Sequence, residues 1–263
     1  MIILKIGGGE AINLDAIVED IAGLDEPVVI VHGANVLRDQ VAEKMGFEKQ
    51  VITSASGYSS VYSDESAMDA ILMAYSGLRN KRLVELCQRQ GINAVGLTGL
   101  DGRIVQGARN RGIRVIENGK KMLKRDFSGK PKAVNGDLLT LLMDNGYVPV
   151  LTIPICDENG FAINSENDDI VCELQAALSA DTVVQLIEAP GFLDNADDPS
   201  STIHTLTRAE LQRREEGVEG RIKRKLHALN KLARGNVKRV IISDGRVSNP
   251  VSQALAGNGT IIE

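Results

Sequence analysis

Aromatic and membrane-type features are scarce in this chain of 263 residues. It contains no tryptophan, aromatic residues make up 3% of it, and no apolar run approaches the length that spans a bilayer. This composition argues against a base-stacking nucleic-acid surface and against the aromatic belts of a membrane protein. The N-terminus begins as a strand rather than as a signal peptide. We therefore expect no nucleic acid and no membrane as a partner, and a cytoplasmic location.

Cysteine and histidine are also few, with three of each. Cys87, Cys156 and Cys172 are odd in number, widely spaced and set in apolar or helical surroundings. This pattern predicts buried free thiols rather than a disulfide framework or a zinc site. The histidines lie in three separate segments and form no local metal pattern. We expect no metal held by the protein itself, and a Ser-His-Asp triad has no support.

Two common nucleotide motifs are missing. The P-loop pattern Gly-x4-Gly-Lys-Ser/Thr does not occur, and the N-terminal glycines lack the Gly-x-Gly-x-x-Gly spacing of a Rossmann-type dinucleotide enzyme. What is present is Lys5 beside a glycine triplet at 7–9, and a second lysine, Lys225, in a helix that follows Gly220. Glycine lets a backbone approach an anion closely, and lysine supplies the positive charge. The two segments predict a phosphate site, and a plain tight turn is the alternative for the glycines alone.

Short apolar runs alternate with amphipathic stretches along most of the chain. This alternation predicts an α/β fold in which a mostly parallel central sheet is sandwiched by helices. Ligands of such folds bind at the carboxyl ends of strands, where Lys5, His32 and Thr98 lie. The hydrophobic residues, 43% of the chain, can fill the core of one large unit or of two lobes. We expect strands at 2–6, 28–31, 94–97, 148–153, 183–187 and 237–242.

Residues 101–132 break this rhythm. They read as short polar strands separated by turns of the types Asp-Gly, Arg-Gly, Asn-Gly and Ser-Gly, which predicts hairpins projecting from the sheet. The segment has ten basic and three acidic residues, a net charge of +7 in a chain of net charge −5. A solvated basic face is the ordinary explanation, and nucleic acid or an acidic protein are the other partners to consider. A second irregular stretch, 191–201, predicts a surface loop.

Helical phase sharpens two positions. In the helix expected after residues 164–169, burial of Val171, Leu174 and Leu178 places Asp168 beside the apolar face and Asp169 nearly opposite, so Asp168 is the candidate functional carboxylate. Helix capping is the alternative role for either aspartate. In the helix after Gly220, Lys225 lies within an apolar stripe, where it either snorkels to the edge or meets an anion. The stripe consists of Ile222, Leu226, Leu229, Leu232 and Ala233. The opposite side of the helix consists of Lys223, Asn230 and Arg234.

Taken in order, several motifs resemble those of the amino acid kinase family, the fold of N-acetylglutamate kinase. They lie at 5–8, 31–33, 96–99, 162–168, 189–191 and 220–225, and so cover nearly the whole chain. Residues 77–85, 96–102 and 244–247 are most similar to kinases that phosphorylate aminoadipate or glutamate held on LysW, a small acidic amino-group carrier protein, in lysine and arginine biosynthesis. The resemblance implies a carbamate kinase-like fold with a substrate lobe at 1–172 and a nucleotide lobe at 173–263.

The resemblance also assigns roles to residues. It implies that Lys5 and Lys225 stabilise the transferring phosphoryl group and that Asp168 positions both lysines. Backbone N–H groups near this path are implied at Gly7, Gly8, Gly33 and Ala34. Substrate contacts are implied at Gly57, Val61 and Asn164, and nucleotide contacts at Glu188, Gly191 and Phe192. The implied cofactors are ATP and Mg²⁺, the metal being bound mainly through phosphates and water, and a homodimer is expected.

Three departures from the family pattern bear on the substrate. Ala34 replaces the second glycine after the histidine, and Val61 replaces an arginine that grips the substrate. On the nucleotide side, Ile187-Glu188 replaces the usual Ser/Thr-Asp. The alternatives are therefore a kinase for free N-acetylglutamate, a specialised relative with another carboxylate substrate, and an inactive relative that senses a ligand. Retention of Lys5, Asp168 and Lys225 argues against the inactive relative.

Overall fold

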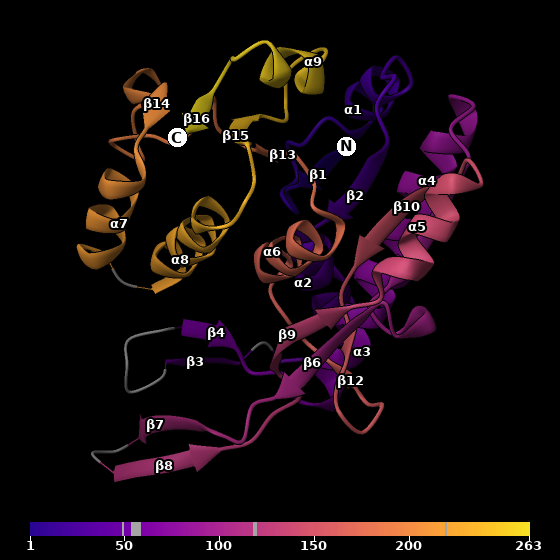
Figure 1. Ribbon diagram of the computed structural model, residues 1–263. Helices are drawn as coiled ribbons and strands as arrows, with labels where there is room; N and C mark the ends of the chain where they lie inside the picture. Colours follow the sequence, from indigo (N-terminus) through magenta and orange to yellow (C-terminus); the bar gives the residue numbers. More distant parts are fainter. Residues whose placement is uncertain (49, 54–58, 118–119, 219) are drawn as a thin grey trace.

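A computed structural model describes the chain except residues 49, 54–58, 118–119 and 219. Its centre is an eight-stranded sheet with the order β14-β16-β15-β13-β1-β2-β10-β5, seen in Figure 1. Neighbouring strands run parallel except β15 and β16, which are antiparallel. The strands are β1 Ile2–Ile6, β2 Val28–His32, β5 Ala94–Thr98, β10 Val148–Thr152, β13 Thr182–Ile187, β14 Thr205–Leu206, β15 Arg239–Asp244 and β16 Thr260–Ile262. The predicted fold class and strand positions are confirmed, whereas β14 and β16 were not expected.

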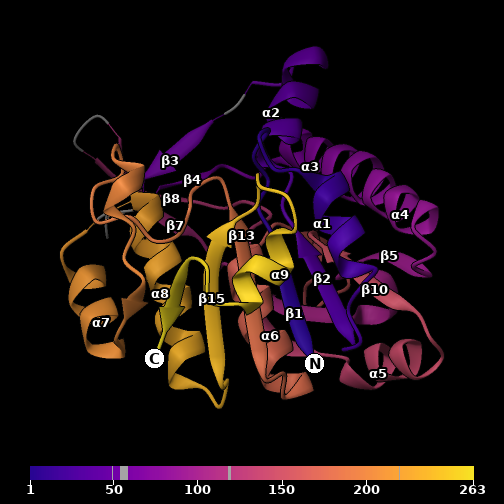
Figure 2. The same cartoon turned by 90° about the horizontal axis from the view of Figure 1, so that it is seen from above.

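Helices cover both faces of the sheet, as Figure 2 shows. On β1, Ile3 belongs to a core that includes α5, α6 and α8, whereas Leu4 belongs to one that includes α1, α4 and α9. A strand buried on both faces reads as a continuous apolar run, which is why the sequence located these strands. The helices are α1 Leu14–Ile21, α2 Asn35–Lys44, α3 Glu65–Ile71, α4 Asn80–Arg89, α5 Gly136–Asp144, α6 Asn167–Leu178, α7 Arg208–Glu216, α8 Gly220–Arg234 and α9 Pro250–Leu255.

Smaller sheets extend from this body, and Figure 1 shows two hairpins projecting from it. The four-stranded sheet has the order β12-β11-β6-β9, and β3 pairs with β4 and β7 with β8 in antiparallel hairpins. The hairpins predicted within 101–132 are thus confirmed. The strands are β3 Val51–Thr53, β4 Ser59–Val61, β6 Val105–Arg109, β7 Ile113–Glu117, β8 Lys120–Lys124, β9 Gly129–Val134, β11 Ile155–Cys156 and β12 Ala162–Ile163.

The proposed lobes share one continuous sheet. β1, near the N-terminus, pairs directly with β13 of the C-terminal part. The central sheet is therefore continuous between the two proposed lobes, and the lobe boundary at 172/173 stays a prediction. The predicted loop at 191–201 contains one short helical turn, η3 Pro199–Ser201, and is exposed over 194–200. All three cysteines are buried and free, as predicted. In the part of the chain that is described, no helix is both long and apolar enough to cross a membrane.

The packing of α8 differs from the predicted stripe. Leu226 and Leu229 are buried as expected, but Ile222 is 44% exposed and Lys225 is exposed as well. Asn230, expected on the outer side, is buried because α7 packs there: its Nδ2 donates to Glu215 Oε2 at 2.5 Å. The sequence of α7 is almost entirely polar and predicts no element that packs on α8, so this second face of α8 was expected to face solvent.

Candidate functional site

The turns that follow β1 and β2 are in backbone contact. A Cβ on Gly8 would lie 2.6 Å from the Ala34 nitrogen, and a Cβ on Gly33 would lie 2.9 Å from the Gly8 nitrogen. Real side chains do not tolerate such distances, so a residue other than glycine at either position would push the two turns apart. The glycines predicted as a phosphate turn therefore bring two strand ends together at one edge of the sheet.

The backbone N–H groups of these turns do not all face a ligand. Gly7 N–H donates to Leu186 O and Gly33 N–H donates to Ile6 O, both at 2.9 Å. These bonds continue the pattern of the parallel sheet. Gly8 N–H has no acceptor among the described residues, so of these three it is the one open to a phosphate oxygen.

Ala34 lies behind the turn rather than at its surface. It is 1% exposed, does not line the cavity described below, and immediately precedes α2. The predicted phosphate contact at Ala34 therefore has no direct counterpart in the lining of the site.

Lys5 and Asp168 form a buried ion pair at the centre of the site. Lys5 Nζ lies 2.9 Å from Asp168 Oδ1, and the two side chains are 10% and 17% exposed. Lys5 is carried by β1 and Asp168 by the first turn of α6. Burial opposes ionisation of Asp168, but the attraction and hydrogen bond of Lys5, together with Lys225, hold the pKa of Asp168 below its usual range. Asp168 is therefore an anion at neutral pH.

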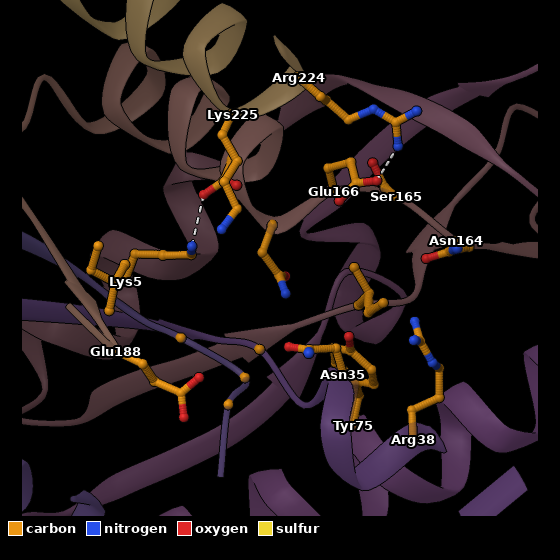
Figure 3. A pocket seen from close by; sticks show the side chains of 18 of the residues that line it. Lys5, Asn35, Arg38, Tyr75, Asn164, Ser165, Glu166, Glu188, Arg224 and Lys225 are labelled. Carbon is orange, nitrogen blue, oxygen red and sulfur yellow. Dashed lines mark hydrogen bonds and ion pairs between the residues drawn. The ribbon is translucent and has the colours of Figure 1, made fainter. Parts of the chain in front are cut away.

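Lys225 approaches the same place from α8. Figure 3 shows the ends of Lys5 and Lys225 converging on one region of the cavity. Lys225 is exposed rather than buried, and both it and Ile222 line the cavity. The prediction that Ile222 is buried with the apolar stripe was wrong, because the start of α8 borders the open site.

The neighbouring Asp169 is not the solvent-facing group that helical phase predicts. It is half-buried, and this burial raises its pKa although Lys130 partly opposes the shift. The two consecutive aspartates of α6 thus have pKa values shifted in opposite directions. Only Asp168 has a buried lysine as its ion-pair partner.

The site is a cavity of about 510 Å³ at the carboxyl edge of the sheet. The predicted site residues that line it are Lys5, Gly7, Gly8, Gly33, Asn164, Asp168, Glu188 and Lys225. The lining also includes Asn35, Arg38, Tyr75 and Arg224, to which the sequence analysis assigned no role. Arg38 lies on the polar helix α2 and Tyr75 in η1, a π-helix at Leu72–Arg79. Neither position carries a motif, so no sequence signal marked them.

Asn164 is fixed at the base of the hairpins. Its backbone N–H donates to Phe127 O at 2.7 Å, and its side-chain Nδ2 donates to Ser63 Oγ at 2.9 Å. These bonds hold the residue between β12 and the segment before β9, with the side chain at the cavity. Of the other predicted substrate contacts, Gly57 lies outside the described residues, and Val61 has a described backbone position at the end of β4.

The predicted nucleotide residues separate into two places. Glu188 lines the cavity beside the glycine turn, where its Oε1 accepts a hydrogen bond from Ala11 N–H at 2.6 Å. Gly191 and Phe192 lie outside the lining and pack against β16, where Phe192 N–H donates to Thr260 Oγ1 at 2.7 Å. The structure thus brings Glu188, but neither Gly191 nor Phe192, to the charged residues of the site.

His32 is part of the support behind the site. It is fully buried, and burial, with a contribution from Arg79, lowers its pKa to about 3. The neutral ring has Nε2 3.1 Å from Asn80 Nδ2, which assigns the acceptor role to Nε2 and the proton to Nδ1. The His32 carbonyl oxygen accepts from Thr152 Oγ1 at 2.9 Å and from Asn167 Nδ2 at 3.1 Å. A histidine held neutral in this way orients the strand ends and is no proton carrier at neutral pH.

A metal held by protein side chains has no support in the described part of the chain. There, no three side chains of His, Cys, Asp or Glu come together as metal ligands. Of the carboxylates that line the cavity, Asp168 is paired with Lys5 and Glu166 with Arg224, and Glu188 lies beside the glycine turn.

Comparison with known proteins places the chain among kinases. The model of the amino acid kinase family matches residues 1–244. The chain is 38% identical over 268 residues to the LysW-aminoadipate kinase of Thermus thermophilus, covering all of both proteins. It is 39% identical over 266 residues to the LysW-aminoadipate kinase of Deinococcus radiodurans, covering all of this chain and 91% of that one. Among solved structures, N-acetylglutamate synthase from Neisseria gonorrhoeae superimposes with a TM-score of 0.78 at 20% identity, covering 99% of this chain and 58% of that one.

Proposed function

This chain belongs to the amino acid kinase family, and from that membership we propose that it phosphorylates a side-chain carboxylate of an amino acid held on a small acidic carrier protein of the LysW type. The enzyme is a phosphotransferase, and its family implies ATP as the phosphoryl donor. Aminoadipate is the proposed amino acid and lysine biosynthesis the proposed pathway, because relatives at 38% and 39% identity carry the name LysW-aminoadipate kinase. Glutamate, and with it a role in arginine biosynthesis, is the second candidate.

The observation that carries the proposal is the meeting of Lys5, Asp168 and Lys225 in one cavity. The substrate carboxylate attacks the γ-phosphorus of ATP, the bond to the β-phosphate oxygen breaks, and an acyl phosphate and ADP leave. Such a transfer needs positioning and charge stabilisation rather than a covalent nucleophile. We assign this stabilisation to Lys5 and Lys225, with Asp168 holding Lys5 in place through the 2.9 Å ion pair.

We propose that Mg²⁺ enters the site together with ATP. Because the described residues offer no cluster of metal ligands, the ion is held mainly by phosphate oxygens and water, as is usual for nucleotide-bound magnesium. We assign to Gly8 N–H a hydrogen bond to a phosphate oxygen of the nucleotide. Glu188 is the carboxylate of the cavity nearest the glycine turn, and Gly191 and Phe192 remain proposed nucleotide contacts from the adjoining loop.

The positive charge and exposed apolar side chains of the hairpin segment 101–132 favour an acidic macromolecule as the partner. Exposed cations of 101–132 lie in the same segment as exposed apolar side chains on β8, where Met122 is 48% and Leu123 is 56% exposed, and the exposed Lys120 and Arg125 flank that pair along the chain. A surface that combines positive charge with apolar area suits a protein with an acidic face better than it suits a free small molecule. The exposed cations are Arg103, Arg111, Arg114, Lys120, Arg125, Lys130 and Lys132.

A substrate panel tests the proposal. Hydroxylamine converts an acyl phosphate to a hydroxamate, so product can be compared for carrier-linked aminoadipate, carrier-linked glutamate and free N-acetylglutamate, with wild type and with Val61→Arg. We expect efficient turnover of a carrier-linked substrate and poor turnover of the free one by the wild type. Efficient use of free N-acetylglutamate overturns the carrier proposal, and turnover of none of the three favours another carboxylate substrate or a ligand sensor.

We also propose a homodimer in the cytoplasm. Apolar side chains of η1 are on the surface, with Leu72 and Met73 each 37% and Leu78 43% exposed. An apolar helical face of this kind is suited to burial against a second copy. Sedimentation equilibrium checks the assembly, and a monomer at micromolar concentration contradicts it.

A further inference from the structure

Apart from Arg224, which pairs with Glu166, the cavity has cationic groups at two separate places. Lys5 and Lys225 converge at one of them, whereas Arg38 reaches the cavity from α2 and points toward Asn164 in Figure 3. The proposed transfer uses the two lysines and leaves Arg38 without a task. Its charge is paired with Asp39 on the same helix, and a second anion at a free edge of this mostly buried guanidinium would offset its desolvation further.

The hydrogen bonds of Arg38 leave one edge of its guanidinium open. Nε and Nη2 both donate to Asp39 Oδ1, at 2.9 and 2.6 Å. These two bonds use the Nε edge and fix the plane of the group. A guanidinium has five N–H donors, so three remain: both protons of Nη1 and the second proton of Nη2. Two parallel N–H groups at this Nη1/Nη2 edge match the two oxygens of a carboxylate.

The surroundings strengthen such a contact. The side chain of Arg38 is 14% exposed, and Tyr75, which is 5% exposed, and Ile153 line the same cavity. Partial removal from water strengthens a charged hydrogen bond. Asn164, held by Ser63, adds an amide on the side to which Arg38 points.

We propose that Arg38 is the specificity residue that binds the α-carboxylate of the amino acid substrate. The inference rests on the proposed function: an amino acid carried through its amino group and phosphorylated on its side chain keeps one free anion, the α-carboxylate. Lys5 and Lys225 stabilise the phosphoryl group at one place while Arg38 holds this carboxylate at the other. Position 61 on β4 holds valine, which has no hydrogen-bonding side chain, so Arg38 supplies the fork from α2 instead.

The test compares two carrier-linked substrates that differ in one group. One has aminoadipate with its natural α-carboxylate, and the other has the α-carboxamide, made by peptide ligation. The hydroxamate assay gives kcat and KM for each with wild type, Arg38→Met and Arg38→Lys. Arg224→Met is the matched control, because Arg224 also lines the cavity and is also paired with a carboxylate, Glu166, but reaches the cavity from α8 instead of α2. Arg82→Met, at an exposed ion pair on α4, controls for loss of an arginine at the surface.

We expect the wild type to prefer the acid to the amide by about 10²-fold in kcat/KM, the scale of a bidentate charged contact. Arg38→Met should lose about 10²-fold on the acid, mainly through KM, and change little on the amide, because the contact is present before and during transfer. Arg38→Lys should keep part of the preference, since lysine retains the charge but not the fork. Arg224→Met should keep the full acid-to-amide ratio whatever its effect on turnover, and Arg82→Met should match the wild type.

The outcomes separate this inference from the function on which it rests. If the wild type turns over the acid and Arg38→Met shows the same acid-to-amide ratio, the Arg38 inference is wrong and the proposed function stands. If the wild type turns over no carrier-linked amino acid, both fail. If Arg38→Met does not fold, an unchanged ratio in Arg38→Lys still overturns the inference.

Discussion

Replacing each of two consecutive aspartates by asparagine gives a sharp test of the site. Asp168 and Asp169 both lie in the first turn of α6, but Lys5 and Lys225 lower the pKa of Asp168 against the effect of burial, whereas burial raises the pKa of Asp169. The negative charge is thus favoured at one position and disfavoured at the next. We expect Asp168→Asn to impair both stability and turnover, and Asp169→Asn to leave both near the wild-type values.

The size of the effect follows from the geometry of the ion pair. Removing one partner of a fully buried pair costs about 3–5 kcal/mol. Lys5 and Asp168 are 10% and 17% exposed and border a cavity, and asparagine keeps an oxygen that accepts a hydrogen bond, so we expect a loss of about 2 kcal/mol. Loss of a preorganised electrostatic contact lowers kcat by about 10²–10³-fold. For Asp169→Asn, which removes a charge that burial disfavours, we expect a change within about 0.5 kcal/mol.

Urea unfolding at pH 7 measures stability, and the hydroxamate assay measures turnover. The pH matters because the folded-state pKa of Asp168 lies below the unfolded value: its ion pair stabilises the fold above about pH 4 and is lost as the pH falls through the folded-state pKa. The wild-type advantage over Asp168→Asn should therefore shrink in acid. Equal stability and equal kcat for the two asparagine variants at pH 7 would refute the assignment of Asp168.

Three further predictions concern other parts of the molecule. Lys5→Ala and Lys225→Ala should each lower kcat by about 10²–10³-fold in the hydroxamate assay, and near-normal turnover of both contradicts the proposed mechanism. Charge reversal on the hairpins should raise KM for the carrier-linked substrate by about tenfold at low salt and leave ATP binding unchanged. The effect should be smaller at physiological salt, where the Debye length is about 8 Å. A KM equal to that of a control variant with Arg82→Glu and Arg89→Glu on α4 argues for a free substrate. The charge-reversal variant has glutamate at Lys120, Lys121, Lys124 and Arg125. Because the pKa of His32 falls to about 3 on folding, the unfolded chain binds a proton that the folded chain excludes. The free energy of unfolding should therefore decline as the pH falls from about 6.5, by up to about 1.4 kcal/mol per pH unit. If urea unfolding of a His32→Gln variant shows the same decline with falling pH, this prediction is wrong.

The sequence was informative where burial and strand ends decide the structure. Strands buried on both faces are mostly apolar, so β1 and β13 could be located without knowledge of their partners, although β1 contains Lys5 and β13 contains Gln185. Parallel strands bring their carboxyl ends to one edge, which is why Lys5 and the segment at Gly33 could be expected together. Turn residues likewise marked the hairpins of 101–132.

The predictions that failed concern helix faces whose contacts depend on a second element of the fold. Asn230 faces α7, an element with no strong apolar period, so the outer side of α8 was taken as solvent. Arg38 lies on a helix in which no residue is buried, and only the three-dimensional fold brings it to the cavity. The engagement of Gly7 N–H by Leu186 O depends on the pairing of β1 with β13, which residue types alone do not specify.

Mass spectrometry of the carrier shows whether the cavity of Lys5, Asp168 and Lys225 transfers a phosphoryl group to an amino acid held on that carrier. Carrier-linked aminoadipate is incubated with the protein, MgATP and hydroxylamine, and the intact carrier is weighed. We predict complete conversion of the side-chain carboxylate to a hydroxamate with the wild type, and a rate about 10²–10³-fold lower with Lys5→Ala. An unmodified carrier after many hours with the wild type, or equal rates with the two proteins, would contradict the account.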